Sequence, residues 1–588
     1  MPDQFATQGS AERYPTGIPW RDLEKDEKPD TGLSEQELLA ELRARWKQLD
    51  QNRTEWTAHW KDVRDYLMPH HGFFMNEGDR ANDGTKKLQK IFDTRPLRAM
   101  DDLAALLQSG LTSPITLWFQ ISHPDKRLME NTRVKAWFDQ VEQQLYHGFA
   151  VSDFYGSSHN LYRELAGMGT GCLYVEEDPV SGYFIFRDFT VGEYWAGLNS
   201  ANQVDTVYVL LPMTPRQMEQ KFGWNRLSDK AKQAWEKDPY GTRKVWMVVC
   251  PRKDFVPGRL DAKGKPWACF YYEDEADAKD GFLAEMGYLE FPFMFPRWDR
   301  ITNADTYGRG PGMKALPDVK SVYQISRSML MGLHKMVDPP MVSPPQYKDR
   351  LNLLPGGMNY AGGGLPGDDV IKPILQINFR LDEAQAMQTN KIDAINDVFF
   401  RNLFIYLLQT TNRTATEIEA RTKEQFLLIG PIINRLQAEF IQPLLDRCFA
   451  ILLRTGKIPL PPIEVQGTEL KWEYVSLLSQ AQKLVNVQGI EHLAMFVGNL
   501  AQVFPEAVDM INQPAMVSVM AESLGVEGRV IRTGEELEQI TQARQKAQQQ
   551  QMEMAQQQSA IDGLAKLGKV GMNKDDPNAV TALLGGGL

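Results

Sequence analysis

Two stretches with helical apolar periodicity flank a segment rich in proline and glycine, and this pattern restricts the fold more than any other feature. In residues 315–337 apolar side chains recur at helical spacing, from Leu316 to Val337. Prolines between 339 and 345 end this helix, because proline lacks a backbone donor and clashes with the preceding turn. Helical periodicity resumes over 379–408. We therefore predict two antiparallel helices joined by an elaborated tip over 338–378.

The residues before this helix pair predict a mixed body. Ser34 and Glu37 form a capping box that opens a helix, with a break near Asn52 before periodicity resumes up to Pro69. Further helices are predicted from Asp93 and over 134–149 and 157–168. Strands are predicted over 172–176 and 183–187 as a hairpin, then over 204–211, 244–250, 267–272 and 291–295, with a helical insertion at 215–235. The fold class is α+β and mainly helical.

The remaining segments are predicted to be helical or flexible. Residues 1–33 are charged and punctuated by proline and glycine, as in a flexible arm. Residues 414–530 show few strand signals. The Gln-rich stretch 535–558 begins a seven-residue apolar repeat of Ile540, Ala547, Met554 and Ile561, which predicts a helix with an apolar seam.

Composition excludes several classes of protein. The 588 residues include 65 Lys and Arg against 76 Asp and Glu, a net charge of −11, so the chain is not a basic nucleic-acid coat protein. No apolar run reaches the roughly 18 residues that span a bilayer, so no membrane association is expected. The four cysteines have no CxxC spacing, which indicates buried thiols in a reducing compartment.

The sequence offers no convincing catalytic motif. Residues 563–569 match GxxxxGK, but Val570 stands where a Ser or Thr would ligate Mg²⁺. His70 and His71 are adjacent, lack a HExxH pattern and precede a glycine-rich loop. There is no GxSxG elbow for a serine nucleophile. We therefore expect neither an enzyme nor a cofactor.

One side of the predicted helix 315–337 is cationic. Lys320, Arg327 and His334 recur every seven residues, with Lys314 and Lys335 beside them. Such a stripe is typical of a solvated face, but it can also face a polyanion or a neighbouring acidic helix. The second helix offers Asp382, Glu383, Asp393 and Asp397 as partners.

Four blocks, in order along residues 35–460, resemble the head-to-tail connecting, or portal, proteins of short-tailed phages. The stretch FPFMFPRWDRITNADTYGRGPGMKALPDVKSVYQISRSML (291–330) resembles the most typical block of this family, in which PRW precedes YGRGP and a long helix. Similar to three other blocks are FDTRPLRAMDDLAALLQSGLTSPITLWFQI (92–121), LAGMGTGCLYVEED (165–178) and NRTATEIEAR (412–421). Beyond residue 460 the likeness is limited to helical, Gln-rich character.

The resemblance implies a dodecameric ring around a channel at one capsid vertex, through which double-stranded DNA is packaged and ejected. It implies partners in terminase, the major capsid and scaffolding proteins and tail adaptor proteins, with assembly in the bacterial host cytoplasm and a final place in the virion. The parts of the subunit would be an arm (1–33), a wing (34–314), stem helices (315–337 and 379–408), a clip (338–378), a tunnel loop (409–416), a helical wing and crown (417–530), and a C-terminal barrel helix with a tail (531–588).

The resemblance also singles out candidate residues for DNA contact. Arg413 falls in the implied tunnel loop and is the first candidate, followed by Lys320, Arg327, His334 and Lys335 of the first stem helix. An acidic subunit with few cations suits a channel in which DNA slides, because each neutralised phosphate adds to the grip on the duplex.

Two alternatives remain at this point. One is a different ring-forming tail or connector component, which would lack paired helices around a Pro/Gly-rich tip. The other is a metal-dependent nuclease or phosphohydrolase that uses dispersed carboxylates with His70 or His71.

Overall fold

A computed structural model describes residues 34–71, 88–129, 131–275, 281–337, 341–342, 372–373, 380–401, 429–466 and 470–474, with scattered positions between 490 and 554. The chain divides into two compact units. The first comprises Met1–Ser122 and Trp137–Leu478, and the second comprises His123–Ala136 and Ser479–Leu588, with the short helix α3 (Lys126–Met129). The predicted arm, the tunnel loop and most of the clip lie outside the described residues.

Helix α1 (Glu35–Leu67) is one continuous helix, which corrects the predicted break near Asn52. The predicted capping box is confirmed: the Ser34 hydroxyl accepts from the Glu37 N–H, and the Ser34 N–H donates to the Glu37 carboxylate over 2.8 Å. The helix continues through Asn52, a weak helix former, because the residue after it, Arg53, is buried. Its guanidinium donates to the Tyr194 carbonyl over 2.5 Å, so a tertiary contact outweighs local propensity.

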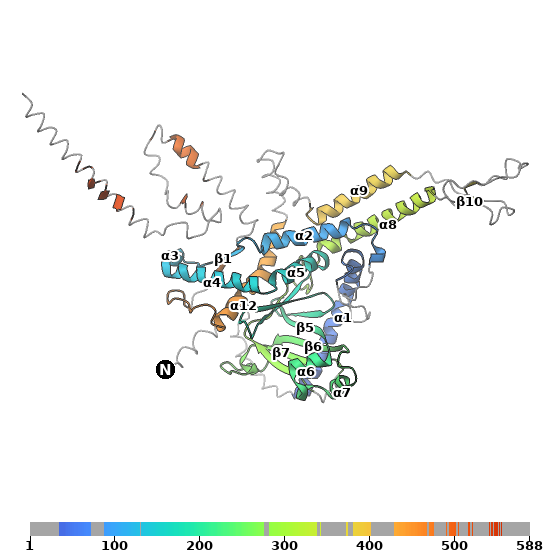
Figure 1. Cartoon of the computed structure of the whole chain (residues 1–588), viewed down its shortest axis with the longest axis horizontal. Coiled ribbons are helices and arrows are strands. Elements are labelled where there is room, and N and C mark those ends of the chain that lie inside the picture. Colours follow the sequence, from blue (N-terminus) through green and yellow to red (C-terminus); the bar gives the residue numbers. More distant parts are fainter. Residues whose placement is uncertain are drawn as a thin grey trace, which may run out of the picture. The chain divides into compact units, whose positions relative to one another are not determined.

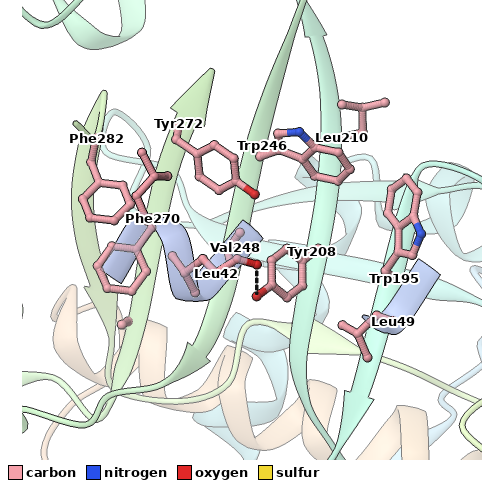
Figure 2. Close-up of a cluster of buried hydrophobic side chains, with 12 residues drawn as sticks. Leu42, Leu49, Trp195, Tyr208, Leu210, Trp246, Val248, Phe270, Tyr272 and Phe282 are labelled. Carbon is pink, nitrogen blue, oxygen red and sulfur yellow. Dashed lines mark hydrogen bonds between the residues drawn. The ribbon is translucent and has the colours of Figure 1, made fainter. Parts of the chain in front are cut away.

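A five-stranded antiparallel meander forms the larger sheet, with strands β4 (Tyr194–Leu198), β5 (Val204–Met213), β6 (Arg243–Pro251), β7 (Trp267–Glu273) and β8 (Ala284–Tyr288) in that order. Helix α1 packs its apolar side on this sheet through Leu42 and Leu49, among the aromatic side chains that Figure 2 shows. The Tyr208 hydroxyl donates to the Leu42 carbonyl over 3.1 Å. Each large apolar side chain buried here contributes about 1.5–3 kcal/mol.

A second sheet has the order β3-β2-β9, with β2 (Cys172–Glu177), β3 (Phe184–Phe189) and β9 (Phe293–Met294). The predicted hairpin over 172–187 is confirmed, because β2 and β3 pair antiparallel from Cys172 opposite Phe189 to Glu177 opposite Phe184.

A separate two-stranded pairing was not predicted. Strand β1 (Phe119–Ser122) pairs antiparallel with β12 (Lys471–Tyr474), a strand inside the stretch that was predicted to be helical. The Ile121 N–H of β1 donates to the Glu142 carboxylate over 2.6 Å, and burial raises the pKa of Glu142 to about 7.

The other described elements complete an α+β fold. These are α2 (Arg95–Leu111), α4 (Thr132–Val151), α5 (Phe154–Met168), α6 (Pro215–Phe222), α7 (Asp229–Lys237), α8 (Pro311–Val337), α9 (Leu381–Val398), α12 (Gln442–Arg454), the short turns η2 (Leu88–Lys90), η3 (Trp224–Arg226) and η4 (Ala262–Gly264), the π-helical turn η6 (Gln437–Ile441), and the two-residue strands β10 (Met341–Val342) and β11 (Lys372–Pro373). The predicted α+β class is therefore confirmed.

Candidate functional site: the helix pair and its glycine anchor

Helices α8 and α9 form the antiparallel pair that the sequence predicted, and they lie side by side in Figure 1. The Gln388 amide donates to the Ser326 hydroxyl over 2.8 Å, and the Lys391 ammonium pairs with the Asp318 carboxylate over 2.7 Å. Moving along α9 from Gln388 to Lys391, the contacted residue on α8 moves back from Ser326 to Asp318, so the two helices run in opposite directions. Short paired strands close the excursion between the helices, since Met341 lies opposite Pro373 and Val342 opposite Lys372.

The bounds of the two helices differ from the predicted ones. Helix α8 ends at Val337 as predicted, but it starts at Pro311 instead of 315, because proline is well tolerated in a first turn. Helix α9 ends at Val398, whereas the prediction ran to 408. Phe400 has a φ of 54°, a left-handed value that an α-helix does not contain.

The start of α8 is held by backbone packed on backbone. A Cβ at Gly169, which caps α5 with a φ of 83°, would lie 2.2 Å from the Gly310 nitrogen. A Cβ at Gly312, in the first turn of α8, would lie 2.5 Å from the Gly167 carbonyl oxygen. Only glycine permits this approach, and we name the contact between Gly167–Thr170 and Gly308–Gly312 the glycine anchor.

The glycine anchor explains two of the sequence blocks that the resemblance rested on. The segment GMGT (167–170) meets GRGPG (308–312), so the two blocks are physical partners. The Gly308 N–H donates to the Thr170 hydroxyl over 2.8 Å, and the Trp298 N–H donates to the Gly169 carbonyl over 2.9 Å.

A buried ion pair fastens the anchor to a later helix. Arg297 of the PRW motif is almost fully buried, and its guanidinium pairs with the Glu439 carboxylate over 2.8 Å. The Arg297 N–H also donates to that carboxylate over 2.9 Å. Glu439 lies in the π-helical turn η6, a rare distortion that is frequent at functional sites. No pattern in the sequence predicts this pair, because no spacing links residues so far apart.

Buried carboxylates lie behind the anchor. Glu164 of α5 accepts from the Thr190 hydroxyl over 2.6 Å, and His71 Nδ1 lies 3.1 Å from the same Glu164 oxygen. The pKa of the nearby Glu193 is raised to about 7, chiefly by burial and also by the charges of Glu164 and Asp188, while the hydrogen bond from the Thr190 N–H lowers it. His71 thus has a structural contact, and the described residues contain no group of three His, Cys, Asp or Glu side chains that could hold a metal ion.

The cationic stripe on α8 divides into a paired part and an open part. Lys320 pairs with Asp62 of α1 over 2.9 Å, and Lys314 pairs with Asp299 over 3.4 Å. These partners are not the α9 acids that the sequence offered, which is a correction for both lysines. Arg327 lies 5.8 Å from the centre of the Phe92 ring and is exposed, as are His334 and Lys335. Arg413 lies outside the described residues.

An open pocket of about 360 Å³ lies between the start of α8 and the end of α9. Its charged side chains largely satisfy one another, since Asp299 pairs with Lys314 and lies 3.4 Å from Arg435. It is lined by Trp298, Asp299, Pro311, Lys314, Asp397, Val398, Phe400, Pro431, Ile432 and Arg435. This arrangement supports the base of the helix pair and offers no unpaired charge to a ligand.

The cysteines and the helices of the described part suggest no other chemistry. All four thiols are free, and burial raises the pKa of each, which suppresses the reactive thiolate. No helix in the described ranges is both long and apolar enough to span a bilayer.

The helix pair is thus held at its base by close backbone packing, and apolar side chains at the end of α8 are exposed, as in a protein that contacts other molecules. The family model described as "Bacteriophage head to tail connecting protein" matches residues 39–531, so the chain belongs to this family. It is 33% identical to the portal protein of Salmonella phage epsilon15 over 91% of this chain and 96% of that protein. It is 30% identical to the probable portal protein of Bordetella phage BPP-1 over 93% of this chain and 98% of that protein. Its function is that of a phage head-to-tail connector, and the family is structural.

Proposed function

We propose that the chain assembles into a dodecameric ring at one capsid vertex, with α8 and α9 as the stem around a channel for double-stranded DNA. The observation that carries this proposal is the apolar surface left bare on the stem. Leu330 is 50% exposed and Val337 is 79% exposed, and Leu333 and Met336 between them are also exposed. Several large apolar side chains exposed along one helix in this way mark a protein contact. Ring closure supplies such a contact on every subunit.

The ring would act as a conduit and as a platform. DNA would enter during packaging and leave during ejection, the terminase would dock on the ring and supply the energy, and tail adaptor proteins would later bind the same vertex. The capsid and scaffolding proteins would hold the ring in place. The net charge of −11 for the whole chain supports this role, because an acidic subunit repels the phosphates of a sliding duplex.

Electron microscopy of the purified protein, viewed down the particle axis, tests the proposal. We expect rings with a central hole and about twelve-fold symmetry, in line with closed cyclic assembly. Native mass spectrometry of the same sample gives the subunit number independently. A compact monomer or dimer at micromolar concentration would contradict the ring.

Arg413 remains the proposed point of DNA contact in the segment that follows α9. Arg413→Ala should leave the rings intact and change the amount or retention of packaged DNA, because one cation per subunit gives a ring of charges around the duplex. Exposed Arg259, which pairs with Asp261 on the wing, gives a matched control as Arg259→Ala. Equal yields of packaged DNA for the two variants would remove Arg413 from the channel.

A further inference from the structure

We propose that the bare side of distal α8 packs against the acidic outer side of α9 in the next copy of this chain, with Arg327 facing Asp382. The inference rests on the ring in the proposed function and names the surfaces that close it. It assigns the open cations of α8 to a protein seam instead of to DNA.

The side of α8 in question continues a contact that already exists within the subunit. Lys320 and Tyr323 pack against the end of α1, where the Lys320 ammonium pairs with Asp62 and the Tyr323 hydroxyl donates to the Tyr66 carbonyl over 2.8 Å. Residues seven apart lie on one side of a helix, so Arg327 and Leu330 extend this side by two turns. Helix α1 ends at Leu67. Beyond it Arg327 lies 5.8 Å from the centre of the Phe92 ring, and both Arg327 and Leu330 are exposed.

This side of α8 carries both apolar and cationic side chains, a mixture that suits a protein partner better than DNA. Leu330, Met331 and Val337 are exposed beside the cations, and between 45% and 80% of each is accessible. Phosphate oxygens gain nothing from leucine or valine, whereas an interface buries such side chains in its centre and places charged pairs at its rim. A stripe that served DNA alone would need only the cations.

The outer side of α9 carries the complementary charge. Gln388 and Lys391 face α8, and Ile392 and Ile395 are buried. Asp393 follows Lys391 by two residues and so lies on the other side of the helix, and Asp382 lies three turns before it on the same line. Both aspartates are exposed, and no basic side chain of the described residues pairs with either.

The register within one subunit sets the expected register between copies. Gln388 lies beside Ser326, and Lys391 beside Asp318. Counting the same number of residues along both helices from these two contacts places Asp382 between the levels of Arg327 and Gly332. Rotation about a ring axis along the stem keeps each residue at its own height. Arg327 of one copy therefore lies within about 7.5 Å of the height of Asp382 in the next, a difference that the long arginine side chain can span. A heterologous contact of two opposite sides closes the ring.

A charge-reversal cycle on the full chain tests this seam. Arg327→Glu and Asp382→Arg, each alone, should raise the subunit concentration at half assembly by about tenfold or more, because a like-charge pair would repeat at every contact. The double variant Arg327→Glu/Asp382→Arg should recover most of the wild-type assembly. Arg259→Glu, a reversal on the wing, should assemble as wild type. Native mass spectrometry reads the ring fraction, and circular dichroism melting shows that each variant is folded.

The outcomes separate the seam from the ring itself. Wild-type protein that forms no rings would overturn the proposed function and the seam with it. In a second outcome, wild type and Arg327→Glu form rings equally well, but the variant packages less DNA. That result would place the stripe in the channel and overturn the seam alone. A folded Arg327→Glu variant that loses assembly and is not rescued by Asp382→Arg would show that α9 is not the partner.

Discussion

The two halves of α8 have similar sequence patterns and opposite environments. In the proximal half, Val319 and Val322 are fully buried against α1, α5 and α9, and the glycine anchor fixes the first turn. In the distal half, Leu330 and Val337 follow the same helical spacing but are exposed. Apolar periodicity therefore predicts which side of a helix is buried, but it does not determine whether the packing partner is in the same subunit or in another. The proximal half serves folding, and we propose that the distal half serves assembly.

The largest expected effect is on the anchor that makes the proximal half rigid. Gly169→Ala adds a Cβ 2.2 Å from the Gly310 nitrogen and also forces a φ of 83° on alanine, so it should lower the free energy of unfolding by about 4 kcal/mol. Urea denaturation measures the loss.

Gly258→Ala is the matched control for the anchor. Gly258 has a φ of 86° but open space around it, so only backbone strain of about 1 kcal/mol is expected. Equal losses for the two variants would show that the anchor is not tightly packed.

A second pair of variants compares the two halves of α8 directly. Val319→Ala should lower the free energy of unfolding of the subunit by about 2 kcal/mol, because it leaves a cavity in a core position. Leu330→Ala should change it by less than about 0.5 kcal/mol, because the side chain is half exposed.

Both variants are measured under conditions that keep the subunit monomeric, by thermal and denaturant unfolding. The fraction of protein in rings should show the opposite ranking: Leu330→Ala should lower it more than Val319→Ala does. A large loss of monomer stability for Leu330→Ala would mean that the distal half is covered within the subunit.

The smallest expected effect concerns the carboxylates behind the anchor and depends on pH. The pKa of Glu193 is about 7 in the folded chain against 4.5 for an ordinary Glu, so the folded state favours the protonated form. Its contribution to stability is complete below pH 4.5 and is lost as the pH rises through 7. Glu193→Gln cannot ionise, and it should exceed wild type in stability by about 1–2 kcal/mol at pH 8, with a smaller gain at pH 5.

Unfolding curves at the two pH values measure the gain from Glu193→Gln. Glu177→Gln, at the exposed end of β2, controls for the loss of one negative charge. A gain that is the same at both pH values would assign the effect to packing and not to ionisation.

Local signals in the sequence predicted the elements whose causes are local. The Ser34 capping box opens α1, the hairpin over 172–187 forms where its turn residues indicated, and the prolines after Val337 coincide with the end of α8. In each case a neighbour within a few residues supplies the hydrogen bond or the steric block. The family itself could be identified from four short blocks, and the comparisons confirm it.

Other features were decided only when distant segments met. The continuity of α1 depends on the hydrogen bond from Arg53 to Tyr194, and strand β12 depends on its partner strand at 119–122. Lys320 pairs with Asp62 of α1 and not with an acidic residue of α9. The sequence by itself determined the helix pair and the α+β body, because these follow from the spacing of apolar residues and from the backbone conformations that each residue allows. Tertiary structure decided that GMGT meets GRGPG and that Arg297 meets Glu439, because contact between segments that are far apart in the chain depends on how the whole core packs.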